Sequence, residues 1–205
     1  MEELDVINSR LGGHAITLKG VQSILKNQLF QKPISILEIG CGGGDNLRVI
    51  KRWAVRKKVN VQLTGVDINE SCIAFAKAQP HNAGIQFLCA DYKTVRLEQD
   101  VIFSSLFCHH FTDDELIEML KWMQRYARVG FFINDLHRFP LAYYSIKLLT
   151  RSFSKSYLVK NDAPLSVLRG FTKGEWQQLF QKAMLLNYNI RWQWAFRWLV
   201  TCTTT

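Results

Sequence analysis

The glycine-rich segment Ile36–Asn46, which reads ILEIGCGGGDN, constrains the fold of this chain more than any other feature. An apolar strand over residues 36–39 runs into glycines at positions 40, 42 and 44, and an amphipathic helix is expected to start at about Asn46. Glycine reaches positive φ at little cost and, lacking a Cβ, lets the backbone approach a ligand closely. A strand, a glycine turn and a helix in this order predict the first unit of a doubly wound α/β sheet with a nucleotide-binding turn.

The spacing of the glycines separates two classes of nucleotide site. A dinucleotide turn needs G-x-G-x-x-G, but Asp45 stands where that template has its third glycine. The form E-x-G-x-G-x-G instead resembles motif I of the Rossmann-like S-adenosylmethionine-dependent methyltransferases, and it lies on Glu38, Gly40, Gly42 and Gly44. The resemblance implies that Glu38 binds the ammonium group of S-adenosylmethionine and that backbone N–H groups of the turn, which includes Cys41, bind its carboxylate. The alternative is a glycine turn that binds no ligand.

Two further strands end in acids. The strand Val61–Asp67 predicts that Asp67 accepts the ribose hydroxyls, with Ile68 beside the adenine or ribose. The alternative for Asp67 is the N-cap of the helix that follows. The next strand begins at Ile85, and the family resemblance implies cofactor contacts at its end, with an acid on the exocyclic amine of adenine and the residue before it donating a backbone N–H. These predicted contacts lie at Ala90, Asp91 and Tyr92.

The fourth strand, Asp100–Phe107, leads into a pair of histidines. Ligands of open α/β sheets lie beyond the carboxyl ends of the strands, so Ser105 is predicted to contact the cofactor. His110 is the first candidate for a general base and His109 the second. The alternative is that one histidine merely packs against the turn.

The fifth strand, Val129–Asn134, is followed by a further polar cluster at the same edge of the sheet. His137 is the third candidate base, and Asp135 and Arg138 are predicted to contact the substrate. The alternative readings are a loop cap for Asp135 and a surface ion pair for Arg138.

The segment after the fifth strand has the pattern of an amphipathic helix over Leu141–Val159, and it is predicted to form a substrate lid within residues 139–170. Residues 1–30 are predicted to form an N-terminal helical cap that closes over the site, with a surface hairpin as the alternative. These two additions supply three more predicted substrate contacts, at His14, Tyr143 and Arg169. Two final strands, Asn189–Trp194 and Phe196–Cys202, are expected to pair as a hairpin, with strand seven antiparallel.

Composition limits the remaining choices. The 205 residues fit one domain, and no apolar run reaches the roughly 18 residues of a membrane span. The acidic start of the chain and five cysteines without C-x-x-C spacing favour a cytoplasmic protein. The fourth strand ends in serines, so no metal site is predicted. The net charge of +9 comes largely from a helix face that is either solvated or attracts an anionic membrane or RNA; this face comprises Arg48, Lys51, Arg52, Arg56, Lys57 and Lys58.

The sequence therefore predicts a single α/β domain over residues 1–205, with a doubly wound, seven-stranded, mostly parallel sheet. The segments Leu11–His14, Phe107–Phe111, Asn134–Arg138 and Ser166–Thr172 also resemble a bacterial methyltransferase group associated with type III polyketide synthases. This resemblance implies O-methylation of a small hydrophobic phenol, pyrone or quinol by a monomer or homodimer, without specific nucleic-acid binding. The alternatives are an RNA or protein methyltransferase and a non-catalytic module that binds S-adenosylmethionine.

Overall fold

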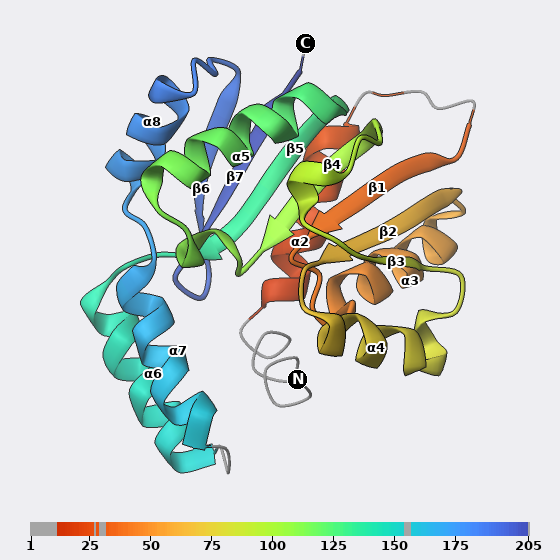
Figure 1. The fold of residues 1–205 in the computed structure, drawn as a ribbon. Coiled ribbons are helices and arrows are strands. Elements are labelled where there is room, and N and C mark those ends of the chain that lie inside the picture. The colour runs from red at the N-terminus through yellow and green to blue at the C-terminus, as the bar shows by residue number, and fades with distance from the viewer. Residues whose placement is uncertain (1–11, 27, 29–31, 154–156, 205) are drawn as a thin grey trace.

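The computed structural model describes residues 12–26, 28, 32–153 and 157–204, and it shows one seven-stranded sheet (Figure 1). The strands lie in the order β3-β2-β1-β4-β5-β7-β6, and β7 runs antiparallel to both of its neighbours. The predicted mostly parallel sheet with an antiparallel strand seven is confirmed. The strands are β1 (Ile34–Ile39), β2 (Val61–Asp67), β3 (Gln86–Cys89), β4 (Gln99–Ser105), β5 (Ala127–Leu136), β6 (Tyr188–Gln193) and β7 (Arg197–Thr203).

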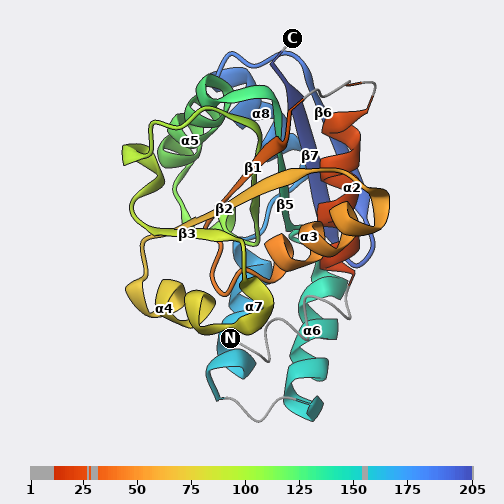
Figure 2. The same ribbon diagram turned by 90° about the vertical axis from the view of Figure 1, so that its right-hand side faces the viewer.

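Helices cover both faces of the sheet (Figure 2). Buried side chains of α2, α3 and α4 form one core with one face of β1, and those of α5 and α8 form a second core on the opposite face. The helices are α2 (Gly13–Leu25), α3 (Asp45–Lys57), α4 (Glu70–Ala78), α5 (Asp113–Tyr126), α6 (Pro140–Phe153), α7 (Tyr157–Arg169) and α8 (Lys173–Lys182).

The central strand β1 explains how the site residues are aimed. All six of its residues are buried, as expected for a strand with parallel neighbours and helices on both faces. Side chains alternate along the strand, so Ile36 packs with α2 and α3 while Leu37 and Ile39 pack with α5. The side chain of Glu38 points to the same face of the sheet as that of Ile36. Its carboxylate therefore contacts α3 at the carboxyl end of the strand.

The insertion after β5 differs from the prediction. Instead of one amphipathic helix over Leu141–Val159, α6 and α7 pack side by side as a helical hairpin that projects from the carboxyl edge of the sheet (Figure 1). The strand β4 also ends earlier than expected, at Ser105, because Leu106 adopts a φ of 53° that turns the chain out of the sheet. Among the described residues, no helix is long and apolar enough to cross a membrane.

Candidate active site

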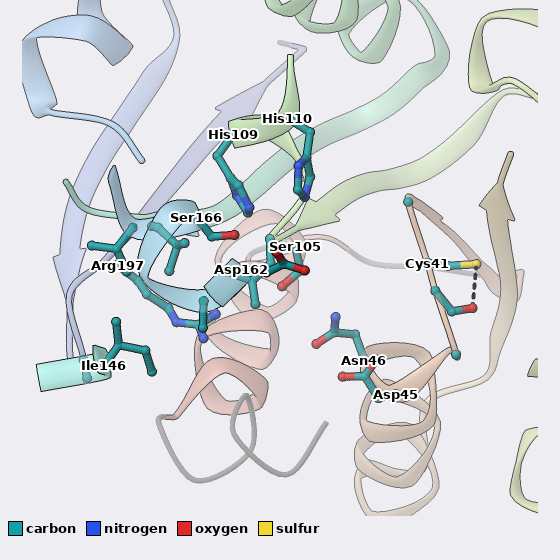
Figure 3. A pocket seen from close by; sticks show the side chains of 18 of the residues that line it. Cys41, Asp45, Asn46, Ser105, His109, His110, Ile146, Asp162, Ser166 and Arg197 are labelled. Atoms are coloured by element: carbon teal, nitrogen blue, oxygen red, sulfur yellow. Dashed lines mark hydrogen bonds between the residues drawn. The ribbon is translucent and has the colours of Figure 1, made fainter. Parts of the chain in front are cut away.

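A cavity of about 870 Å³ opens at the carboxyl edge of the parallel strands (Figure 3). Its floor is the glycine turn after β1, and one wall is the 3₁₀ turn Cys108–His110 after β4. The α6–α7 hairpin and the β6–β7 turn close the other sides. The cavity therefore lies where open α/β sheets bind their ligands.

The glycine turn needs its glycines. Gly40 has a φ of 68°, and a Cβ placed there would overlap the ring of Phe107. Gly44 has a φ of 74°, and its Cβ would come within 2.7 Å of the ring of Phe87. Both positions combine a left-handed backbone with a close neighbour, so any larger residue displaces the turn that forms the cavity floor.

Asp67 holds this turn from the end of β2. One of its carboxylate oxygens accepts a hydrogen bond from the N–H of Gly42 and the other from the N–H of Asn69, both at 2.9 Å. The N-cap of α4 is Asn69, which accepts from the N–H groups of Ser71 and Cys72, so the capping alternative for Asp67 does not apply. Each carboxylate oxygen retains a further lone pair, so a contact with ribose is compatible with these bonds.

Glu38 presents an unsatisfied carboxylate to the cavity. It is 1% exposed, and its Oε1 accepts a hydrogen bond of 2.8 Å from the side chain of Asn46. Its Oε2 has no hydrogen-bond partner among the described residues. Burial, with the negative charge of Asp45, raises the pKa of Glu38 well above its usual range. A cationic group bound here would satisfy Oε2 and keep the carboxylate ionised, so an ammonium group fits the site.

The predicted adenine contacts lie outside the cavity lining. Asp91 accepts a hydrogen bond from the N–H of Lys93, and Ile68 is 74% exposed. The N–H of Ala90 already donates to the carbonyl of Asp67 at 3.0 Å, so the predicted contact of this N–H with adenine is not supported. The predicted cofactor contact of Tyr92 is corrected, because the ring of this residue is buried against Trp122 in the core.

A buried hydrogen bond between His109 and Asp135 links the ends of β4 and β5. Nδ1 of His109 lies 2.7 Å from Oδ1 of Asp135, and the backbone N–H of His109 donates to Oδ2 at 3.3 Å. Burial alone would raise the pKa of Asp135, but the charge and hydrogen bond of His109 and the N–H of Leu136 hold it below its usual range. The ionised Asp135 can only accept, so Nδ1 of His109 carries the proton and Nε2 is the basic nitrogen.

This pair changes the roles predicted for both residues. Asp135 is fully buried behind His109, so the predicted substrate contact of Asp135 is corrected to a contact with the histidine. His109 lines the cavity, with its ring directed into it (Figure 3). His110 lines the cavity too, its ring centroid 4.2 Å from that of His109. Burial and the neighbouring His109 lower the pKa of His110, so it is neutral at pH 7.

Several other predicted site residues lie away from the cavity. His137 packs between Phe139 and Trp198, and burial lowers its pKa. It does not line the cavity, so its role as a base is not supported. Arg138 forms an ion pair with Glu175 at the surface, which was the alternative interpretation of that residue.

The remaining predicted substrate contacts are also displaced. Tyr143 packs edge-on against Tyr144, whereas Ala142, Ser145 and Ile146 of the same helix line the cavity. Arg169 is exposed outside the lining. Nε2 of His14 lies 2.9 Å from Asp45 at the start of α3, so this residue ties α2 to the glycine turn. Cys41 and Ser105 do line the cavity, as predicted for cofactor contacts.

Sequence reasoning missed Arg197. It is the first residue of β7, is 3% exposed and lines the cavity. The available signal was an arginine between the aromatic residues Phe196 and Trp198, at the start of a mostly apolar strand. The hairpin residues Asp162 and Ser166 were likewise not predicted. Within the described residues, no group of three or more His, Cys, Asp or Glu side chains is arranged to hold a metal ion.

Comparisons with known proteins find similar sequences and structures. A family model described as a methyltransferase domain matches residues 36–130. A curated relative from Bacillus cytotoxicus, malonyl-[acyl-carrier protein] O-methyltransferase, is 30% identical over 156 residues, which are 75% of this chain and 49% of the relative. The chain thus spans about half the length of that relative.

Solved structures share the whole fold. The plantazolicin methyltransferase BpumL in complex with SAH matches with a TM-score of 0.71 and 20% identity, covering 96% of this chain and 86% of BpumL. Human N-acetylserotonin methyltransferase in complex with SAM matches with a TM-score of 0.69 and 13% identity, covering 99% of this chain and 54% of the human protein. Residues 36–130 thus match a methyltransferase domain, and the chain has the fold of structures solved as methyltransferases with SAM or SAH bound.

Proposed function

We propose that this protein binds S-adenosylmethionine and O-methylates a small hydrophobic phenol, pyrone or quinol. The observation that carries this proposal is the His109–Asp135 pair, which presents one basic nitrogen to a cavity beside the unsatisfied carboxylate of Glu38. When bound, S-adenosylmethionine would supply the methyl group and become S-adenosylhomocysteine.

The cofactor contacts follow from the groups around the glycine turn. Oε2 of Glu38 would accept a hydrogen bond from the ammonium group, and the turn that begins at Gly40 would present backbone N–H groups to the carboxylate. Asp67 would accept the ribose hydroxyls, and Asp91 would accept the exocyclic amine of adenine. Ser105, whose hydroxyl lies 3.3 Å from the side-chain amide of Asn134, would border the sulfur end.

The acceptor chemistry follows from the orientation of His109. The proton of the acceptor hydroxyl passes to Nε2 of His109 as the oxygen takes the methyl group, and Asp135 stabilises the imidazolium that forms. A phenol with a pKa near 10 needs this help at neutral pH, whereas an ionised pyrone enol does not. His109 therefore replaces His110 as the first candidate base.

The cavity walls favour a hydrophobic acceptor. Side chains of α6 and of the β6–β7 turn provide apolar and aromatic surface, including Ala142, Ile146, Leu149, Trp194 and Phe196. A volume of about 870 Å³ is suited to a small organic molecule. The α6–α7 hairpin would act as the lid over this molecule. The curated O-methyltransferase relative supports oxygen as the methylated atom.

The first test is calorimetric titration of the purified protein with S-adenosylmethionine, S-adenosylhomocysteine and NAD. We expect the two sulfur ligands to bind, NAD not to bind, and Asp67→Ala to weaken both sulfur ligands. A screen of phenols, pyrones and quinols with the wild type and His109→Asn then tests the acceptor class. Cofactor binding without turnover on any acceptor would favour the non-catalytic module, and turnover on RNA or protein alone would favour the macromolecular alternative.

The other predicted partners stay predictions. The basic face of α3, which includes Arg52, Arg56 and Lys57, is solvent-exposed or partly so, as both the solvated and the membrane-binding interpretations require. Sedimentation with vesicles of anionic and neutral lipids separates these two interpretations. Light scattering distinguishes a monomer from a homodimer, and fractionation of cells tests the cytoplasmic location.

A further inference from the structure

Arg197 is a buried cation without a bound anion. Its Nε and Nη1 atoms are inaccessible to solvent and have no hydrogen-bond partner in the described part of the chain. The ion pairs between described residues do not include it. Leaving a guanidinium desolvated and unpaired is costly, so a structure that keeps one there is expected to use it for a ligand.

The nearby carboxylates attract this arginine but do not bond to it. Asp135 and Asp45 act on Arg197 electrostatically but form no hydrogen bond with it. Both oxygens of Asp135 accept bonds from His109, and Oδ2 of Asp45 lies 2.9 Å from Nε2 of His14. Burial lowers the pKa of Arg197 to about 10, so the guanidinium is still positively charged at neutral pH.

The guanidinium reaches the acceptor side of the cavity. Arg197 lines the cavity together with Ile146 and Ser166 of the α6–α7 hairpin, and Figure 3 shows Cys41 of the glycine turn and Asp45 and Asn46 at the start of α3 on the opposite side of the view. The cofactor carboxylate is expected at the glycine turn, so it does not account for Arg197. His109 projects into the same space from the 3₁₀ turn after β4.

We infer that Arg197 binds a carboxylate of the acceptor and thereby directs the hydroxyl of the same molecule to His109. A planar guanidinium pairs with a carboxylate through two parallel hydrogen bonds, which fixes orientation as well as position. The other arginine of the lining, Arg48, donates to the carbonyl of Gly43 and to the side chain of Asn82. The lining also carries the acidic side chains Glu38, Asp45 and Asp162, so a monoanion fits Arg197 better than a dianionic phosphate. This inference rests on the proposed function, and it narrows the acceptor to a hydrophobic hydroxy acid.

The test is binding of matched acids and amides to the protein loaded with S-adenosylhomocysteine. The probes are benzoate, 4-hydroxybenzoate and decanoate, each paired with its primary amide and measured by calorimetry. We expect the wild type to bind at least one acid about tenfold or more tightly than its amide, as for a charge-assisted hydrogen-bonded pair. Arg197→Met should abolish this preference and Arg197→Lys should retain part of it. The control Arg138→Met, at an arginine outside the cavity lining, should retain all of it.

Three outcomes would overturn the inference. They are equal binding of acids and amides by the wild type across all three pairs, an unchanged preference in Arg197→Met, and a tenfold or greater loss of S-adenosylhomocysteine affinity in that variant. The third outcome would assign Arg197 to the cofactor carboxylate. Arg197→Met should also melt at a higher temperature than the wild type, because the substitution removes a buried charge that has no hydrogen-bond partner. If Arg197→Met does not fold, Arg197→Gln is used in its place.

The same measurements separate this inference from the proposed function. If S-adenosylhomocysteine does not bind, the proposed function fails, and the acid preference is then measured on the unliganded protein. If S-adenosylhomocysteine binds and acids show no preference, the inference alone fails.

Discussion

Oδ1 of Asp135 lies 2.7 Å from Nδ1 of His109, and this contact joins the ends of two adjacent parallel strands. The carboxylate is fully buried and the histidine side chain is 3% exposed, so water does not compete for the bond. The pair orients one ring nitrogen toward the protein and leaves the other for the cavity. The hydrogen bond therefore fixes the tautomer of His109, so that the nitrogen facing the cavity can accept a proton.

Replacing His109 by asparagine should slow methyl transfer to a phenol by about 10²- to 10⁴-fold, the range for loss of a general base. The binding of S-adenosylhomocysteine should stay within about twofold of wild type, because His109 acts on the acceptor. His137→Asn is the matched control, since its ring packs outside the cavity. Equal rates for His109→Asn and the wild type on a phenol would remove His109 as the base.

Replacing Asp135 by asparagine should also slow the reaction, by up to about 10⁴-fold, because the histidine loses its tautomer and orientation. The variant should also lose the stability that the ionised carboxylate of Asp135 contributes to the folded state. The folded state holds the pKa of Asp135 below its unfolded value, so ionised Asp135 stabilises the fold above about pH 4. This contribution disappears as the pH falls through the folded-state pKa.

Melting temperatures measured from pH 7 down to pH 3 check the second effect. The wild type should lose stability more steeply than Asp135→Asn over the acid part of this range. Parallel curves for the two proteins would show that the pKa of Asp135 does not differ between the folded and unfolded states.

Much of the sheet was predictable because its signals are local. The glycine turn, the acids Asp67 and Asp91, and the apolar strands each depend on a few consecutive residues, and the structure has the expected seven strands with strand seven antiparallel. The α6–α7 hairpin was harder to predict, because a dense run of apolar residues does not show where one helix stops and the next begins.

The roles of the site residues depend on registers that the sequence does not display. Ser105 of β4 pairs with Asn134 of β5, and this register sets Asp135 beside His109. Arg197 reaches the cavity only because β7 inserts between β5 and β6, where it faces Leu136. Tyr92 was misassigned because it begins the 3₁₀ turn Tyr92–Thr94 after β3, and its ring packs in the core against Trp122.

Replacing Glu38 by glutamine should stabilise the ligand-free protein at neutral pH. Burial raises the pKa of Glu38 in the folded state above its unfolded value, so stability decreases as the pH rises from about 4 through the folded-state pKa. The stability of Glu38→Gln does not depend on pH in this way, because glutamine does not titrate. The melting temperature of this variant should therefore exceed that of the wild type at pH 7.5. The same variant should bind S-adenosylmethionine more weakly, because the ammonium group loses an anionic partner.

The two readouts of Glu38→Gln distinguish a ligand site from a structural acid. Thermal melts give the stability and calorimetry gives the affinity, both at pH 7.5. A variant that is less stable than the wild type and binds the cofactor equally well would mean that Glu38 serves the fold through Asn46 alone.

Replacing Gly40 by alanine should destabilise the protein far more than the matched change at Gly84. Both residues have positive φ, 68° and 78°, so both alanines incur the left-handed penalty of about 1–2 kcal/mol. A Cβ at Gly84 meets no atom within 4 Å, whereas one at Gly40 overlaps the ring of Phe107. Overpacking adds about 1–3 kcal/mol at Gly40, so Gly40→Ala should lose about 2–5 kcal/mol in urea unfolding. Because the displaced turn forms the cavity floor, Gly40→Ala should also lose S-adenosylhomocysteine binding, while Gly84→Ala should keep it. Equal stability of the two variants would contradict the close packing of Phe107 on the turn.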